Sequence, residues 1–453
     1  MKKTENRIIN VISIFTIGFL LPFIISFLKL SKLSSDYDIR TIILVIGSYL
    51  SFYFGAKYVG ANNVGAASRR PRKQNASPTN KKKEAKCLPY NITCSKIIIF
   101  IGIISFVSFL IEFMILKFIP LLSLGTPHAY STFHVFGLHY ITTLYFMMPA
   151  LSILNYYDVR GSHSSPVRTG AHTRNNSLDC SALVLIFVSF AYAILMSLLL
   201  VSRALLIMTV VLAGIAYLTW EAGCFPYKKN VGKQNASPTK KNVGAATKKN
   251  VGAASCRPIK SYIIFGIAFV IFIALYVTIT YFRSHSVEYL NGIFEMKENT
   301  PIFITQPYMY LTQGFENLNY LVINNERLTF GRRTLNPLFS LLRTKVYFPL
   351  VTEAPFYQIK LELTSKPIIY DLYYDFSFLG TCIIMFFIGF ITKKIENKAY
   401  KENNIYYTLF FSLICYYLLF SFFQSYLSML DVWFYLIFIY LLYLVSTFKK
   451  TKR

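Results

Sequence analysis

Charged residues are scarce in this sequence of 453 residues. They make up 15% of the chain, whereas a soluble domain carries about 25%. Acidic residues are the scarcer sign, with 20 Asp and Glu against 47 Lys and Arg. Hydrophobic residues reach 54% and are gathered in long runs. This combination excludes an ordinary soluble domain and indicates a membrane protein.

Close cysteine pairs and phosphate-binding loops are also missing. The seven cysteines lie at positions 87, 94, 180, 224, 256, 382 and 415, without a C-x-x-C pair. The histidines His128, His134 and His139 are six and five residues apart, which does not match the i, i+4 pair of a helical zinc site. There is no Gly-rich phosphate loop. We therefore expect neither a metal nor another cofactor.

The long apolar runs predict about ten transmembrane helices, because about 20 mainly apolar residues are needed to cross a bilayer. The expected helices cover 8–30, 39–58, 97–119, 138–157, 182–201, 204–220, 261–281, 369–392, 405–427 and 432–448. Only Ser202-Arg203 separates the fifth from the sixth. A tight hairpin there keeps Arg203 at a membrane surface, away from the costly bilayer centre. The predicted fold class is an all-α, polytopic integral membrane protein.

The surplus of basic residues predicts the orientation of these helices. Residues 60–96 and 221–260 each hold nine Lys or Arg and one acid, and together they supply +16 of the formal charge of +27. An excess of Lys and Arg in short loops marks the cytoplasmic side. Both termini and these loops are therefore expected in the cytoplasm, and 282–368 becomes one large extracytoplasmic loop. Nucleic acid is not expected as a partner, because it requires a folded basic face.

Two of the expected cytoplasmic loops contain the same short sequences. Asn-Val-Gly-Ala-Ala-Ser occurs at 63–68 and again at 250–255, without apolar periodicity. We interpret these stretches as low-complexity inserts; a basic clamp on anionic membrane lipids stays open. The expected segments are 1–59 with transmembrane helices 1 and 2, 60–96 as the first basic insert, 97–220 with helices 3 to 6, 221–260 as the second basic insert, 261–281 with helix 7, 282–368 as the outer loop, and 369–453 with helices 8 to 10 and a basic tail.

Arginines near the expected outer face are candidates for binding pyrophosphate, because the planar guanidinium donates two parallel hydrogen bonds to such an anion. They are Arg203 at the hairpin, Arg283 after the seventh helix, and Arg332 and Arg333 in the outer loop. For Arg203 and Arg283 an alternative stays open, in which they mark helix ends and contact lipid headgroups.

Four side chains of the outer loop are candidates for binding a glycan: Tyr308, Tyr310, Phe315 and Glu316. Flat rings beside hydrogen-bonding groups suit sugars, which present an apolar face and a rim of hydroxyls. The same pattern is typical of an amphipathic helix that lies on the membrane with its aromatic residues at the interface. The two interpretations are compatible.

Two carboxylates open the expected eighth helix. Asp371 and Asp375 are four residues apart, so they share one helix face. Loss of solvation one turn into the membrane raises a carboxylate pKa, which favours Asp375 as a catalytic proton acceptor. His139 is the reserve candidate. The alternative for Asp375 is a pairing with a nearby arginine that only fixes helix packing.

Several short segments carry a family resemblance. They are Gly125-Thr126-Pro127-His128, Phe136-Gly137-Leu138-His139-Tyr140, Ser202-Arg203, Tyr310-Leu311-Thr312-Gln313-Gly314-Phe315, Thr329-Phe330-Gly331, Tyr374-Asp375-Phe376 and Leu379-Gly380. In these segments the chain resembles the oligosaccharide repeat unit polymerases, the O-antigen polymerases of the Wzy type. The likeness covers most of the chain outside 60–96 and 224–258, and the Arg-and-Gly loop motif of some members is not evident.

The resemblance implies a glycosyltransferase-type polysaccharide polymerase in the cytoplasmic membrane. Such an enzyme joins oligosaccharide repeats carried on polyprenyl pyrophosphate at the outer face, as a step of surface polysaccharide biosynthesis. Flippase and chain-length regulator proteins are then the expected protein partners.

Three other functions stay open: an O-antigen ligase-like enzyme, a glycosyltransferase that uses a polyprenyl-phosphate sugar, and a flippase for lipid-linked oligosaccharides. A ligase shares the arginines. A flippase is expected to have short loops and charges deep inside its helices. The polyprenyl-phosphate-sugar transferase depends on a metal at an acidic pair, for which Asp36-Tyr37-Asp38 is the candidate.

Overall fold

The computed structural model describes residues 9–68, 92–123, 132–163, 176–224, 287–298, 301–325, 327–342, 344, 347, 355–402 and 404–451. Its regular structure over these residues is helical. Six helices are long and apolar enough to cross a membrane: Ile39–Val59, Cys94–Leu116, Ser181–Leu199, Arg203–Trp220, Ile369–Glu402 and Leu430–Phe448. Shorter apolar helices lie at Val11–Ser26 and Ile405–Leu419. The prediction of a helical membrane protein is therefore confirmed. The number of spans and their orientation stay predictions.

The first half of the chain contains α1 (Val11–Phe15), the π-helical η1 (Thr16–Leu20), α2 (Leu21–Ser26), α3 (Ile39–Ser68), α4 (Ile92–Leu116), η2 (Pro120–Leu122), α6 (Leu138–Thr142), η3 (Thr143–Met147), α7 (Met148–His163), α8 (Asn176–Leu199) and α9 (Arg203–Cys224). The second half contains α11 (Val287–Phe294), α12 (Ile302–Asn324), α13 (Asn336–Leu341), α15 (Ile369–Glu402), α16 (Ile405–Leu419), η6 (Tyr426–Ser428) and α17 (Leu430–Thr451).

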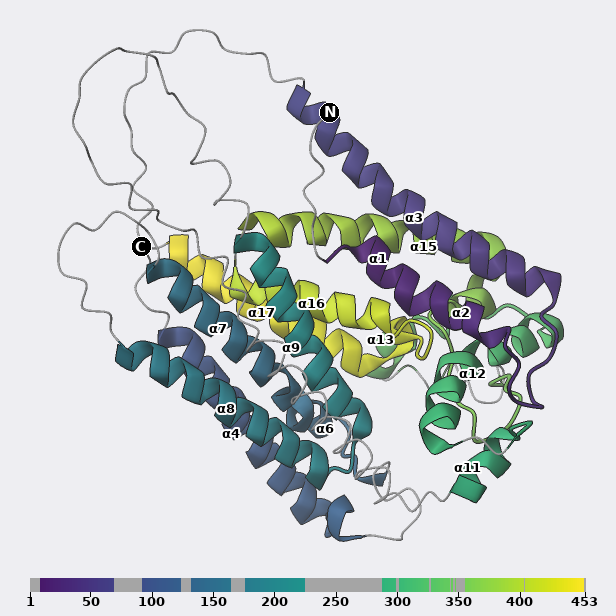
Figure 1. Ribbon diagram of the computed structural model, residues 1–453, viewed down its shortest axis with the longest axis horizontal. Helices are drawn as coiled ribbons and strands as arrows, with labels where there is room; N and C mark the ends of the chain where they lie inside the picture. Colours follow the sequence, from purple (N-terminus) through teal and green to yellow (C-terminus); the bar gives the residue numbers. More distant parts are fainter. Residues whose placement is uncertain are drawn as a thin grey trace, which may run out of the picture.

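Helix α12 lies at one end of the bundle, together with α11 (Figure 1). The first turn of α3 reaches α12 there, because Thr41 Oγ1 donates a hydrogen bond to Asn319 Oδ1. The segment before α15 also reaches α12, since Pro367 lies against Gly314. We call this the α12 end. At the opposite end, Val11 N begins α1 with a hydrogen bond to Glu396 Oε2 of α15.

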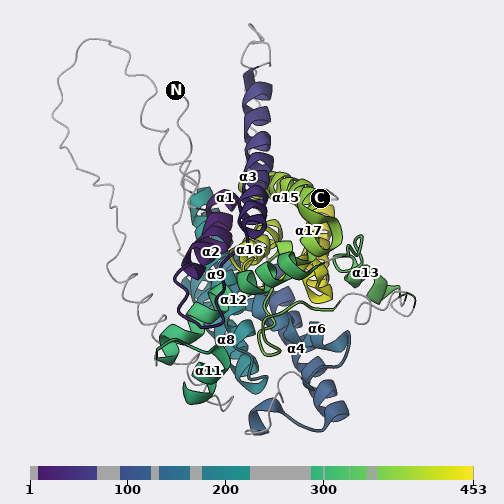
Figure 2. The same ribbon diagram turned by 90° about the vertical axis from the view of Figure 1, so that its right-hand side faces the viewer.

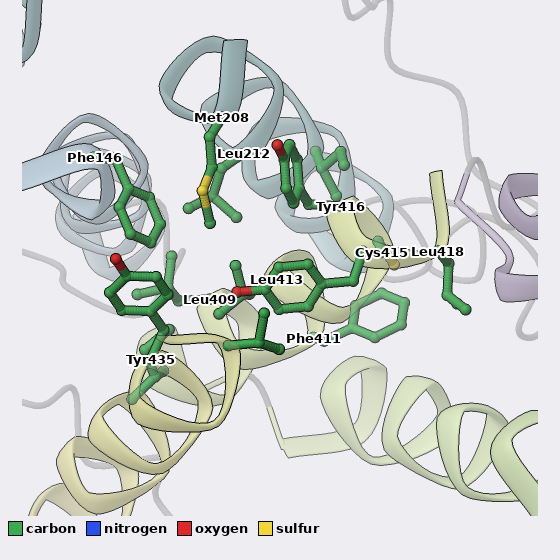
Figure 3. Close-up of a cluster of buried hydrophobic side chains, with 14 of the residues drawn as sticks. Phe146, Met208, Leu212, Leu409, Phe411, Leu413, Cys415, Tyr416, Leu418 and Tyr435 are labelled. Carbon is green, nitrogen blue, oxygen red and sulfur yellow. The ribbon is translucent and has the colours of Figure 1, made fainter. Parts of the chain in front are cut away.

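Apolar side chains from α7, α9, α16 and α17 form the centre of the bundle. In the cluster of Figure 3, Met208 and Leu212 of α9 face Leu409 and Leu413 of α16, with Tyr435 of α17 beside them. The hairpin predicted between the fifth and sixth spans is confirmed, since α8 ends at Leu199 and α9 begins at Arg203.

Helices α3 and α15 run side by side, and α3 projects beyond its neighbours (Figure 2). Glycines allow the close approach: a Cβ on Gly55 would overlap the Phe386 carbonyl oxygen, and a Cβ on Gly389 would overlap that of Phe52. Small residues at a helix contact are typical of membrane proteins, where close backbone packing replaces the hydrophobic effect.

Several helix boundaries differ from the sequence prediction, those of α15, α3 and α16 among them. Helix α15 continues past 392 to Glu402, where Lys393–Glu396 and Lys398–Glu402 pairs support it. Helix α3 continues to Ser68, into the range predicted as an insert. Helix α16 ends at Leu419 instead of near 427, because the following carbonyls accept hydrogen bonds from the segment before α15. The expected helix at 261–281 lies outside the described residues.

Candidate functional site

Asp371 lies in the first turn of α15, and 1% of its side chain is exposed. Arg333 Nε donates to its Oδ1 at 3.0 Å. Lys366 Nζ and Ser428 Oγ donate to its Oδ2 at 2.6 and 2.5 Å. The guanidinium of Arg333 also lies over the ring of Tyr374, 4.6 Å from its centroid. Two cations around one buried carboxylate offset the cost of removing it from water.

Asp375 lies one turn further along α15 and is also buried. Its Oδ1 accepts hydrogen bonds from the hydroxyl of Thr329 and from Arg333 N, and its Oδ2 accepts from Thr334 N at 2.7 Å. The carboxylate therefore holds the loop 329–334 against α15. The two carboxylates share one helix face, as the spacing predicts. The side chain of Arg333 pairs with Asp371, whereas Asp375 accepts a hydrogen bond from the backbone N–H of Arg333.

Helix α15 is broken directly after these carboxylates. Ser377 has φ 56° and ψ −165°, a conformation that residues other than glycine rarely adopt. The carbonyl oxygens of Tyr374 and Asp375 accept hydrogen bonds from Thr329 N and Phe330 N at 3.2 and 3.1 Å. The loop thus supplies hydrogen bonds to the last carbonyls before the break.

Two glycines surround Phe376 at the break. A Cβ on Gly380 would overlap the Phe376 Cβ, and Gly331 adopts φ +88° with the Phe376 ring close by. Residues 329–331, 374–376 and 379–380 are segments that carry the family resemblance. The structure joins them into one hydrogen-bonded and packed unit.

Arg203 begins α9 and is buried beside α12. Its Nη1 donates to Gln306 Oε1 at 3.4 Å, and its Nη2 donates to Tyr310 Oη at 3.1 Å. Both acceptors are neutral groups, and they orient the guanidinium. The amide Nε2 of Gln306 is buried and has no hydrogen-bond partner among the described residues. An oriented cation beside a buried amide donor is an arrangement that suits an anion.

A chain of contacts joins Arg203 to the Asp371 cluster. The ring of Tyr310, which accepts from Arg203, lies 5.6 Å from the ring of Phe423. The Phe423 carbonyl accepts from Lys366 N at 3.1 Å, and Lys366 binds Asp371. Two arginines predicted to bind pyrophosphate, Arg203 and Arg333, therefore belong to one assembly at the α12 end.

Tyr308 and Phe315 of α12 are buried. Tyr308 Oη accepts a hydrogen bond from Leu30 N at 2.9 Å. The Phe315 ring packs on the rings of Phe19 and Phe23, with centroids 5.7 and 5.2 Å away. These contacts give both side chains a packing role. Tyr310 is partly exposed.

Glu316, the fourth predicted glycan contact, connects α12 to the loop after α2. Its Oε1 accepts from Tyr37 Oη at 3.1 Å, and its Oε2 accepts from Ser35 N at 3.3 Å. Burial raises the pKa of Glu316 to about 7, although these hydrogen bonds act in the other direction. Burial and the nearby Glu316 carboxylate also raise the pKa of Tyr37.

The acidic pair of this same loop is engaged by cations. Asp36 pairs with Lys29, and Asp38 pairs with Arg40 at 2.8 Å. Hydrogen bonds from Arg40 lower the pKa of Asp38 to about 2. Within the described part of the chain, no group of three or more His, Cys, Asp or Glu residues is placed to hold a metal ion.

His139 forms a contact that the sequence analysis missed. Its Nδ1 lies 3.2 Å from Oε1 of Glu112, a buried residue of α4. The ring of His134 lies 5.0 Å from that of His139, and burial together with His139 lowers the pKa of His134. A single acid inside a predicted membrane helix was the available signal for Glu112, because such residues are costly and often functional.

The remaining candidate arginines are Arg332 and Arg283. Arg332 is partly exposed in the turn after Gly331, where its backbone N–H donates to the Thr329 carbonyl at 3.1 Å. Arg283 lies outside the described residues, as does His128. Comparison of the chain with protein-family models, with curated proteins and with solved structures finds no match.

Proposed function

We propose that this chain is a polymerase of oligosaccharide repeats carried on polyprenyl pyrophosphate, acting at the outer face of the cytoplasmic membrane. The observation that carries the proposal is the convergence of separate resemblance segments at the α12 end. Arg203 contacts Tyr310 of the 310–315 segment, and 329–331 is hydrogen-bonded to 374–375. These contacts bring segments that are far apart in sequence to one end of the bundle, as a shared site requires.

The proposed orientation places the α12 end outside. In support, the lysine- and arginine-rich stretches 60–96 and 221–260 adjoin the ends of α3 and α9 that lie away from α12. An excess of Lys and Arg is typical of cytoplasmic loops. The two termini then lie in the cytoplasm, and about ten spans connect the two sides.

The proposed chemistry uses Arg203 as the main pyrophosphate ligand. Its guanidinium is oriented by Gln306 and Tyr310, and charge develops on the pyrophosphate as it leaves the glycan. A preorganised donor directed at developing charge stabilises the transition state. Arg333 donates its Nε hydrogen bond to Asp371 and lies in the same assembly at the α12 end. Aromatic side chains such as Tyr310 support the advancing glycan.

Deleting the gene tests the proposal at the level of the reaction. Surface glycans of a single repeat are expected, since a polymerase acts after the repeat has been made and moved across the membrane. A loss of all surface glycan would instead assign the chain to an earlier step, such as the flippase. Unchanged repeat number with glycan no longer attached to its final acceptor would assign it to a ligase.

Arg203 variants test the site. Arg203→Ala and Arg203→Lys should both reduce chain growth on purified lipid-linked repeats by roughly 100- to 1,000-fold, because lysine keeps the charge but not the two-pronged contact. Arg327→Ala, at an exposed arginine that follows α12, is the matched control and should leave the rate unchanged. A fully active Arg203→Ala variant would remove this residue from the mechanism.

The metal-dependent transferase predicts the reverse pattern. It requires Asp36 and Asp38, whereas here each carboxylate pairs with a neighbouring cation. Asp36→Asn combined with Asp38→Asn should therefore leave chain growth intact, and EDTA should not stop the purified enzyme. Loss of activity in both experiments would favour the transferase.

A further inference from the structure

Glu112 is a buried carboxylate that the proposed reaction has not yet used. It lies in the last two turns of α4, within a segment apolar enough to span a membrane. Its side chain is 0% exposed. Its Oε1 and Oε2 lie 3.2 and 3.3 Å from Nδ1 of His139, and Oε1 also accepts from Val135 N at 3.2 Å. A carboxylate in a membrane helix is costly, so a role that requires it is the default expectation.

The contact fixes which nitrogen of His139 is able to accept a proton. When the Glu112 carboxylate acts as the acceptor in this contact, as it does toward Val135 N, the proton of the neutral imidazole lies on Nδ1 and the lone pair on Nε2. Of the His139 side chain 21% is exposed, against 0% for Glu112. The Glu112 carboxylate of this pair is therefore buried, and the His139 imidazole is partly exposed.

The pair lies at the same end of the bundle as Arg203. Leu121, which follows α4, packs against Val201 and Leu206 at the α8–α9 hairpin that carries Arg203. Helix α6, which contains His139, contacts α17. The Leu121 contact places the pair at the same end of the bundle as the arginine that we assign to the pyrophosphate.

We propose that Glu112 is a positioning residue that holds His139 as the proton acceptor for the incoming sugar hydroxyl. This inference rests on the proposed polymerase function. Nε2 of His139 takes the hydroxyl proton while the acceptor oxygen bonds to the anomeric carbon of the growing glycan. The bond from that carbon to the pyrophosphate oxygen breaks with its electron pair, so polyprenyl pyrophosphate leaves. The imidazolium then gives its proton to water.

The assignment also gives Asp375 a different task from the one its spacing suggests. The oxygens of Asp375 accept hydrogen bonds from Thr329 and from the backbone of Arg333 and Thr334. A carboxylate engaged in this way holds its loop in place. Asp375→Asn should therefore act through the stability of the loop, and His139→Ala should act through the chemistry.

Glu112→Gln tests the proposal through the pH dependence of chain growth. The base works as the neutral imidazole, and Glu112→Gln removes a negative charge that favours the protonated form. The acidic limb of kcat should therefore move to lower pH, while the plateau falls about 100-fold or more and KM stays near that of the wild type. Glu112→Asp keeps the charge and should retain more activity than Glu112→Gln. A purely structural role would reduce the amount of folded protein without moving the acidic limb.

The comparison of Glu112 variants requires that the other titratable groups facing His139 stay unchanged. They are His134, whose ring lies 5.0 Å away, and Asp431 at the start of α17, which interacts with His139 electrostatically. His134→Gln is the matched control, because it removes a titrating neighbour and leaves the carboxylate contact in place. It should keep a wild-type plateau rate.

Nitrogen-15 NMR of labelled histidine provides a readout that does not depend on activity. The neutral His139 signal should report Nδ1–H in the wild type and lose this preference in Glu112→Gln. The outcomes separate the two proposals. If the wild-type protein fails to extend lipid-linked repeats, the polymerase assignment is wrong. If it extends them and Glu112→Gln keeps the wild-type rate, acidic limb and tautomer, the positioning role of Glu112 is wrong.

Discussion

The two ends of the helical bundle pair their charges in different ways. At the end opposite α12, Lys393 pairs with Glu396 and Lys398 with Glu402, within single turns of α15. At the α12 end, Arg333 reaches Asp371 across 38 residues of sequence. The local pairs follow from the i+3 and i+4 spacing of a helix. The distant pair exists only because a loop folds back onto the start of α15.

Burial gives these pairs different effects on the stability of the fold. The Lys398 and Glu402 side chains are 40% and 35% exposed, so water already solvates both and their pairing adds little. Asp371 is 1% exposed and has two cationic partners. Removing one member of such a cluster leaves the others charged and buried. The Asp371 cluster is therefore more sensitive to single substitutions than the exposed Lys398–Glu402 pair.

The largest effect is expected for Asp371→Asn. The amide keeps the shape but leaves Arg333 and Lys366 without their shared negative charge, which should destabilise the protein by about 3–5 kcal/mol. Thermal unfolding in detergent measures this loss. Asp38→Asn, at a partly exposed pair with Arg40, is the control and should cost much less, because water solvates that pair. Similar melting temperatures for the two variants would contradict the comparison.

Glu316→Gln should change how stability depends on pH. Because the pKa of Glu316 is raised to about 7 from 4.5, the folded protein binds the proton more tightly than the unfolded chain. Stability from this group is therefore highest below pH 4.5, falls as the pH rises to about 7, and changes by roughly 3 kcal/mol in total. Glu316→Gln should remove the loss of stability that this carboxyl causes between pH 5 and 8. Glu362→Gln, at an exposed glutamate, is the control. An equal dependence of stability on pH in both variants would refute the prediction.

Gly380→Ala should disturb the break in α15, because the new Cβ would overlap that of Phe376. We expect a loss of about 1–3 kcal/mol, the usual cost of overpacking. Gly214→Ala, in the unbroken helix α9 with open space at its Cβ position, should instead gain up to about 1 kcal/mol. Melting temperatures of the two variants should therefore shift in opposite directions.

The smallest effect is expected for Glu402→Gln at the opposite end. Loss of an exposed i, i+4 pair costs about 0.3–0.5 kcal/mol, and this loss should shrink further in high salt. Unfolding measurements at low and high ionic strength test it. A loss as large as that of Asp371→Asn would show that burial does not separate the effects of these two pairs.

Short-range patterns of the sequence predicted much of this architecture. Runs of apolar residues predicted the membrane class and the positions of the six long apolar helices, because a bilayer requires length and low polarity whatever the packing. The cost of a buried charge placed Arg203 at a hairpin between α8 and α9. The spacing of Asp371 and Asp375 correctly placed both on one face of α15.

Only the tertiary structure decided which partner each polar group has. Spacing suggested Asp375 as a proton acceptor, yet its oxygens bind Thr329 and the backbone of the same loop, while Arg333 turns to Asp371. Glu112 is a single acid in an apolar run of the sequence, and only the packing of α6 against α4 places His139 beside it. Hydrogen bonds and ion pairs act over a few ångströms, so their partners depend on how distant segments pack, and helical periodicity carries no information about that.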